Sequence, residues 1–434
     1  MSKLSRKFFD YVLPSVFAFA LSGVYTIVDG YFIGNRMGDM GIAAITLGYP
    51  VTTLVQAAGT GLGLGAAICY TILKSRSEDR QAEYMLGTAS LMMLVLSLVM
   101  TGTVLSWLYP ILRLLGAEGA ITEPTAEYVR YIVLGTVFQV MGTGLVPFIR
   151  NMGGAKFAMA AMFCGFLGNI LFDWLFVWVW PYGLAGAAWA SVLGQAIATF
   201  MALGYFASKK ARISLPPFKR LPEIAGKIIR VGAAPFGLVL CPNITLLIMN
   251  RFFLVHGGEQ ALAVYGVIGY IVYIVLLLLQ GVGDGCQPLI SRFYGEKDKN
   301  AMLHTKRLSY ITSFAITLVS ILICILYRKQ AGLLFGASDE SNLQVARILP
   351  WFMAALIFEA YTRMGSAYLY ATEKSSLSYL LVYAEPVLVL AFLLALAPGL
   401  GLLGVWIANP AARAAAAAAA AVIKRRDDRK RLAA

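Results

Sequence analysis

The chain has 434 residues, of which 59% are hydrophobic and only 13% are charged, and its formal net charge is +14. Its mean hydropathy of +0.74 excludes an ordinary soluble domain and is typical of a protein that crosses the membrane many times. In a soluble protein this excess of Lys and Arg would suggest a nucleic-acid partner. In a membrane protein it indicates cytoplasmic loops, so we expect a lipid bilayer and no nucleic acid as partner.

Hydropathy and turn signals predict twelve membrane-spanning helices and therefore an all-α polytopic fold. The predicted spans are 11–34, 41–72, 85–112, 126–149, 157–180, 184–207, 225–255, 260–290, 307–327, 345–370, 376–398 and 401–423. Counted in and beside the loops, 27 Lys and Arg lie on the side of the two termini and 7 on the opposite side. The positive-inside rule then predicts that both termini are cytoplasmic.

The two halves of the chain resemble each other at a nearly constant offset. Pro14, Asp29 and Tyr49 match Pro235, Asn250 and Tyr270 at an offset of 221. Residues 114–117 match 334–337 at 220, and residues 183–186 match 401–404 at 218. Because each half holds six spans, an even number, the repeats should be parallel, with substrate bound between them near the midplane.

The repeat also predicts where the domains begin and end. We expect an amino-terminal lobe at 1–207, a cytoplasmic linker at 208–224, a carboxyl-terminal lobe at 225–423 and a basic cytoplasmic tail at 424–434. The linker carries five basic residues and a Pro-Pro pair, which is typical of a loop. The eight consecutive alanines at 414–421 are anomalous among spans rich in Leu, Val and Ile, and they carry no functional prediction.

Two aspartates, Asp29 and Asp173, lie alone in apolar runs of the first lobe. A carboxylate at such a position costs roughly 2.5–3.5 kcal/mol on insertion scales, so a cation, a proton or a partner should neutralise it. Asn169 precedes Asp173 by four residues and shares its helix face. Asp173 lies nine residues before Tyr182 and Ser191 lies nine after it, so both should lie ~13 Å below the outer turn that contains Tyr182. Asp29 is six residues from the outer end of the first span and should lie ~9 Å below that end.

These four oxygen-bearing side chains predict a site for a small hard cation such as Na⁺ or for a shared proton. At the same offsets the second half has Asn250, Val389 and Leu393, so the site should be confined to the first lobe. A buried polar network that only locks the helices together is the alternative.

Other polar and aromatic positions suggest a substrate cavity. Its candidates, which suit aromatic cations through their rings, sulfur atoms and polar groups, are Tyr25, Tyr49, Gln139, Met141, Met249, Asn250, Tyr270 and Glu359. Glu359 and Arg363 are spaced to form an ion pair, with a cavity-facing role as the alternative. Pro14 lies in the first span as either a hinge or a static kink. The pattern Gly61–Ala66 lacks a preceding strand and predicts close helix packing rather than a dinucleotide site.

Taken together, these residues resemble a known family, the multidrug and toxic compound extrusion (MATE) transporters. The resemblance rests on Pro14 with Asp29, on Asn169-x-x-x-Asp173 and on Gly186–Ser191, and it is to the prokaryotic, DinF-like branch. It implies two lobes forming a V, an ion site of Asp29, Asn169 and Asp173, a hydroxyl from Ser191 where threonine is common, and a carbonyl ligand from Ala187. It also implies a bacterial or archaeal cytoplasmic membrane and a monomer.

The expected function is secondary active export of small amphipathic, cationic molecules in exchange for Na⁺ or H⁺, with no other cofactor. A flippase for lipid-linked oligosaccharides, from the same superfamily, is the runner-up and should show several cationic residues for phosphate. A membrane enzyme is disfavoured, because the sequence has no HExxH, no GxSxG and no His/Cys set with metal-ligand spacing.

Overall fold

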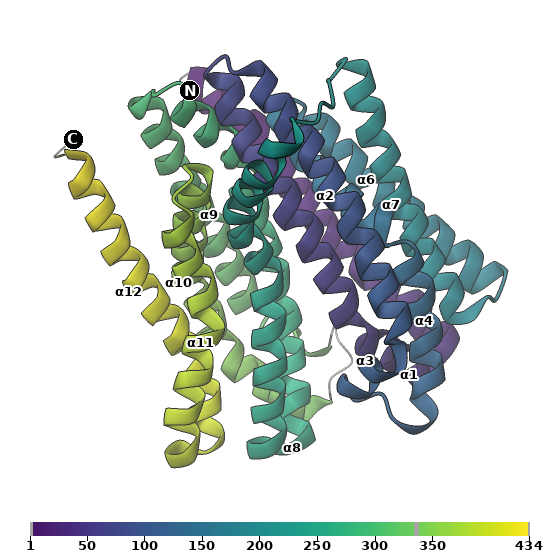
Figure 1. Ribbon diagram of the computed structural model, residues 1–434. Coiled ribbons are helices and arrows are strands. Elements are labelled where there is room, and N and C mark those ends of the chain that lie inside the picture. The colour runs from purple at the N-terminus through teal and green to yellow at the C-terminus, as the bar shows by residue number, and fades with distance from the viewer. Residues whose placement is uncertain (1–2, 334–337, 433–434) are drawn as a thin grey trace. The chain divides into compact units, whose positions relative to one another are not determined.

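The computed structural model describes residues 3–333 and 338–432, and within them the chain forms helices joined by short loops (Figure 1). The helices of the first half are α1 (Lys3–Ser75), α2 (Asp79–Ser106), α3 (Leu108–Leu114), η1 (Gly119–Ile121), α4 (Thr122–Leu134), α5 (Thr136–Asn151), α6 (Ala155–Asp173), η2 (Trp174–Val179) and α7 (Gly183–Ser208). Those that follow are η3 (Phe218–Arg220), α8 (Leu221–Gly295), α9 (Lys299–Leu326), α10 (Asp339–Ala371), α11 (Ser375–Leu400) and α12 (Leu402–Leu432).

The predicted all-α fold with twelve spans is confirmed. Within the described residues, nine helices are long and apolar enough to cross a membrane, and the pair α4 and α5, bent by 54°, makes ten. Two of the nine, α1 and α8, each contain a non-helical glycine, Gly38 and Gly258, that divides them into two membrane-length halves. The predicted breaks between 34 and 41 and between 255 and 260 fall at these glycines.

The described chain divides into two compact units. Of the described residues, unit 2 holds 9–240 and 291–298, and unit 1 holds 3–8, 241–290, 299–333 and 338–432. In unit 2, α6 and α7 pack along each other and α7 also contacts α4 and α5. In unit 1, α12 packs against α10 and α11, and α9 packs against α10. The predicted lobe limits and the linker at 208–224 stay predictions.

The backbone conformation shows the same internal repeat as the sequence. Residues with positive φ recur in pairs: Gly38 and Gly258, Ser77 and Lys297, and Gly153 and Glu373 are each 220 apart, and Gly183 and Gly401 are 218 apart. Each of these residues turns the chain at the end of a helix or at a break inside one. The predicted match of 114–117 to 334–337 is not tested, because residues 334–337 lie outside the described part of the chain.

Gly38 adopts φ 62° and ψ −157°, a conformation that is essentially restricted to glycine. We therefore expect Gly38→Ala to destabilise the protein by about 1–3 kcal/mol, the usual cost of such strain. Gly30→Ala is the matched control, because Gly30 lies in the same helix and an added Cβ there meets nothing within 4 Å. Thermal unfolding of the purified variants tests this, and equal melting temperatures would show that the break tolerates a side chain.

Close helix packing at the alternating glycines is confirmed. A Cβ on Gly63 would lie 2.1 Å from the backbone oxygen of Gly144 on α5, and a Cβ on Gly65 would lie 2.6 Å from the backbone of Gly232 on α8. Successive glycines of this segment therefore contact different helices. The spacing of two residues between them reflects two helix interfaces in unit 2 rather than a phosphate-binding loop.

Candidate functional site

The structure brings Asp29 and Asp173 together in unit 2. Asp29 lies on α1 nine residues before the break at Gly38, and Asp173 is the last residue of α6. Asp173 is fully buried, and the two carboxyl groups lie within hydrogen-bonding range of each other. Ionised carboxylates only accept hydrogen bonds, so such a contact requires a proton or a cation between them.

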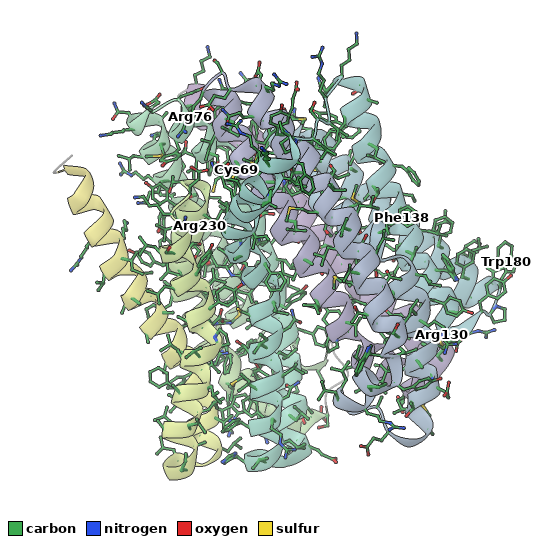
Figure 2. The ribbon with its side chains drawn as sticks, in the orientation of Figure 1. Cys69, Arg76, Arg130, Phe138, Trp180 and Arg230 are labelled. Atoms are coloured by element: carbon green, nitrogen blue, oxygen red, sulfur yellow. The ribbon has the colours of Figure 1, made fainter. Side chains whose placement is uncertain are left out.

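Asn169 and Ser191 join the same cluster from α6 and α7. The Asn169 Nδ2 donates a hydrogen bond to the Ser191 Oγ over 3.3 Å, and Asn169 is 2% exposed. The sequence predicted equal depth for Asp173 and Ser191, and the hydrogen bond places Ser191 beside Asn169, one helical turn before Asp173. Beyond the site, Figure 2 shows Trp180 at the opposite end of unit 2 from Arg76, where α1 ends.

Two tyrosines complete the surroundings. Tyr25, one turn before Asp29 on α1, hydrogen-bonds with Ser191 and stacks on Phe166 with ring centroids 5.2 Å apart. Tyr128 on α4 lies near enough to both aspartates to interact electrostatically with them, and sequence reasoning missed it. The repeat offers a signal for it, because the residue 220 positions later is the apolar Ile348.

Several oxygen atoms of this cluster lack a donor. Among the described residues, Oδ1 of Asp29, Oδ1 of Asn169 and both carboxyl oxygens of Asp173 are buried without a hydrogen-bond partner. A buried acceptor left unpaired costs about 1–3 kcal/mol, and a charged one costs more. Carboxylate and amide oxygens are the ligands that hard cations prefer, so this set of atoms suits Na⁺ or a proton.

Unit 1 has no counterpart of this cluster at the equivalent positions. Val389 and Leu393, which stand 220 residues after Asn169 and Asp173, are fully buried in an apolar core with Met249. The breaks at Gly38 and Gly258 align Asp29 with Met249, since each lies nine residues before its glycine, and not with Asn250 as the offset of 221 predicted. The acidic set therefore occurs in one repeat and an apolar core replaces it in the other.

The remaining predicted ion-site residues lie nearby. Ala187 is one turn before Ser191 on α7 and packs with Ile33 and Val177. The backbone of α1 stays helical through Pro14, and Gly38 is the non-helical residue inside this helix. The hinge role of Pro14 and the ligand role of Ala187 stay predictions.

The predicted substrate-cavity residues are divided between the two units. In unit 2, the Gln139 Nε2 donates to the backbone oxygen of Thr52 over 3.2 Å, Tyr49 is 41% exposed and Met141 is half-buried. In unit 1, Asn250 is half-buried and Tyr270 is 57% exposed. The predicted ion pair of Glu359 with Arg363 is confirmed, with 2.6 Å between Oε1 and Nε.

Comparison with known proteins agrees with the repeat and with the fold. The MatE family profile matches residues 14–175 and again residues 235–398. The multidrug export protein MepA of Staphylococcus haemolyticus is 24% identical over 406 residues, which cover 93% of this chain and 89% of that protein. MepA of Staphylococcus aureus strain MRSA252 is also 24% identical, over 93% of this chain and 90% of its own length.

Solved structures share the fold. A crystal structure of MATE in complex with MaL6 has a TM-score of 0.90 at 22% identity and covers 98% of this chain and 96% of its own. A transporter of the MOP superfamily from Pyrococcus furiosus gives the same TM-score, identity and coverage. The double family match and the repeated helical fold lead to one conclusion: this chain belongs to the MATE family of multidrug export transporters.

Proposed function

We propose that this protein is a secondary active exporter of small amphipathic organic cations, driven by the entry of Na⁺ or H⁺ at the cluster of Asp29 and Asp173. The observation that carries the proposal is the set of buried oxygen atoms without donors around two touching carboxyl groups. Its restriction to one repeat supports a transport role, since a structural need of the fold would recur in the other.

The mechanism follows from charge neutralisation. Two carboxyl groups in contact cannot both stay ionised without a compensating charge, so binding of Na⁺ or H⁺ favours the conformation that brings them together. A ligand shifts a conformational equilibrium only by its differential affinity for the two states. The ion would therefore favour a state in which the substrate is released outward. No cofactor beyond the coupling ion is needed, and we expect a monomer in the cytoplasmic membrane of a bacterium or archaeon.

Reconstituted transport tests the proposal. Ethidium, a permanent cation, should leave proteoliposomes containing the wild-type protein when either a Na⁺ gradient or a H⁺ gradient is imposed separately. Asp29→Asn should reduce this efflux to the rate of protein-free liposomes, because Asn cannot balance a cation or carry a proton. Asp39→Asn, an exposed aspartate on the same helix α1, is the control and should transport normally. Normal efflux by Asp29→Asn would sink the proposal.

A further inference from the structure

The chain between α7 and α8 presents basic and apolar side chains together on the surface of unit 2. Its residues 209–220 join two candidate membrane spans, Gly183–Ser208 and Phe218–Gly295. The segment therefore lies where the chain leaves the membrane and enters it again, on the side that the positive-inside rule predicts to be cytoplasmic. Neither the proposed ion site nor the predicted substrate cavity uses any of these residues.

The basic side chains of this segment have no acid to balance them. Five are exposed, namely Lys209, Lys210, Arg212, Lys219 and Arg220. The sequence contains no Asp or Glu from residue 209 to Pro222. Among the described residues, none of the five forms an ion pair, and the Lys209 Nζ lies 5.8 Å from the ring centroid of Tyr205. The segment is therefore a stretch of unbalanced positive charge at the membrane surface.

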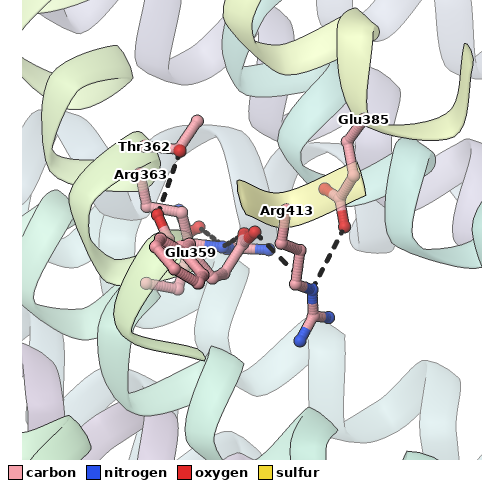
Figure 3. A network of polar contacts seen from close by, with 7 residues as sticks. Glu359, Thr362, Arg363, Glu385 and Arg413 are labelled. Atoms are coloured by element: carbon pink, nitrogen blue, oxygen red, sulfur yellow. Dashed lines mark hydrogen bonds and ion pairs between the residues drawn. The ribbon is translucent and has the colours of Figure 1, made fainter. Parts of the chain in front are cut away.

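The buried charges of unit 1 are balanced, in contrast. Figure 3 shows Arg413 beside Glu359 and Glu385, and its Nε lies 3.9 Å from an oxygen of each. The Arg363 Nε lies 2.6 Å from the Glu359 Oε1. The charges of two arginines and two glutamates cancel, so this cluster has no net charge to attract an anion, whereas the segment 209–220 has.

Three large apolar side chains lie among the basic residues and are exposed as well. Ile213 is 53% exposed, Leu215 is 55% exposed and Phe218 is 87% exposed. Burying large apolar side chains is favourable, so three of them in one short stretch mark an interaction surface. Apolar and basic side chains together suit the interface of an anionic bilayer, where the former enter the acyl boundary and the latter bind phosphates.

Contacts with the rest of unit 2 hold the segment in place. A Cβ added at Gly87 of α2 would lie 2.1 Å from the backbone oxygen of Ser214, so the two backbones touch. Pro216 is buried. Residues that contact the protein thus alternate with Ile213 and Leu215, which remain exposed, and a held backbone presents the exposed side chains.

We propose that residues 209–220 form a docking site for an anionic phospholipid, with Lys219 and Arg220 binding its phosphate and Phe218 entering its acyl region. An anionic phospholipid matches both features of this surface. A free phosphate ion leaves the apolar side chains exposed, and a zwitterionic lipid leaves the positive charge unbalanced. The inference does not depend on the ion or the substrate of the proposed export.

Lipid binding to the purified full-length protein tests the inference. The probes are dioleoyl phosphatidylglycerol and dioleoyl phosphatidylcholine, which share their acyl chains and differ in charge. Native mass spectrometry should show tighter binding of phosphatidylglycerol by the wild type. Lys219→Gln with Arg220→Gln should weaken this binding ~25-fold, because each basic residue near an anionic surface contributes a factor of about 5. Binding of phosphatidylcholine should hardly change.

Lys297→Gln with Lys299→Gln is the matched control, since it removes the same charge from exposed positions on the same predicted side. Glu296 and Asp298 alternate with these lysines, so that stretch has no net charge and should not contribute. Loss of the preference for phosphatidylglycerol in this control, or its retention in the first double variant, overturns the inference. All four substituted side chains are exposed, so both proteins should melt at the wild-type temperature.

Two further arms test the apolar contact and the source of the phosphate. Phe218→Ser should weaken the binding of both lipids alike, ~10-fold, through lost apolar burial. Leu114→Ser, which is equally 87% exposed in unit 2, is its control and should bind as the wild type does. Inorganic phosphate at constant ionic strength should not displace phosphatidylglycerol. Displacement would assign the site to a phosphate ion and overturn the lipid site, as would equal wild-type affinity for the two lipids or no lipid binding.

Discussion

Asp173→Asn is expected to abolish ion-driven ethidium efflux while the protein remains folded. Asp173 is fully buried and both of its carboxyl oxygens lack donors, so it contributes more unsatisfied oxygen atoms than any other residue of the cluster. Asn keeps the size of the side chain but cannot neutralise a bound cation. The melting temperature should stay level or rise, since an unpaired buried carboxylate destabilises the fold.

The same variant identifies the coupling ion. If Na⁺ binds at this site, Na⁺ at roughly 100 times its Kd should stabilise the wild type by about 2.7 kcal/mol, and Asp173→Asn should lose this stabilisation. Asp39→Asn should keep both the stabilisation and the efflux. Asp173→Asn protein that still exports ethidium under a gradient would place the coupling site elsewhere in the chain.

Gly63→Ala should cause a large loss of stability in unit 2. Its Cβ would lie 2.1–2.5 Å from three backbone atoms of Gly144, and backbone cannot move aside as a flexible side chain can. Overpacking of this kind typically costs about 1–3 kcal/mol and occasionally more. Size-exclusion profiles and melting temperatures of detergent-purified protein would measure the loss.

Gly102→Ala on α2 is the matched control, because nothing lies within 4 Å of a Cβ added there. Alanine also has the higher helix propensity, so this variant should equal or exceed the wild type in stability. If Gly63→Ala were as stable as Gly102→Ala, the close approach of α1 and α5 would not hold the unit together.

Much of the fold could be predicted from the sequence because the membrane imposes strong rules on it. Long apolar runs must become helices, and the glycines that divide α1 and α8 fall between the predicted spans. The bend between α4 and α5 could not be predicted, since Gly135 and Thr136 lie in a continuous apolar pattern. Such a bend depends on tertiary packing rather than on local composition.

The candidate site shows a similar division. Asn169 and Asp173 share a helix face by spacing alone, and turn arithmetic relates them to Ser191. The sequence analysis missed Tyr128, because the difference from Ile348 in the second repeat marks the position but does not show which way α4 turns the side chain. The position of Arg413 between two glutamates depends on α10, α11 and α12 packing together, which spacing along one helix cannot reveal.

The π-helix η2 explains a difference in length between the repeats. The offset is 220 at Gly153 and Glu373 but 218 at Gly183 and Gly401, so the first repeat holds two more residues between these turns. A π-helix places more residues in each turn than an α-helix. In the first repeat, η2 begins directly after Asp173. The helix α11 of the second repeat contains no such segment. If the two repeats arose by duplication of one ancestral half, a single local insertion of two residues beside Asp173 would account for their difference in length.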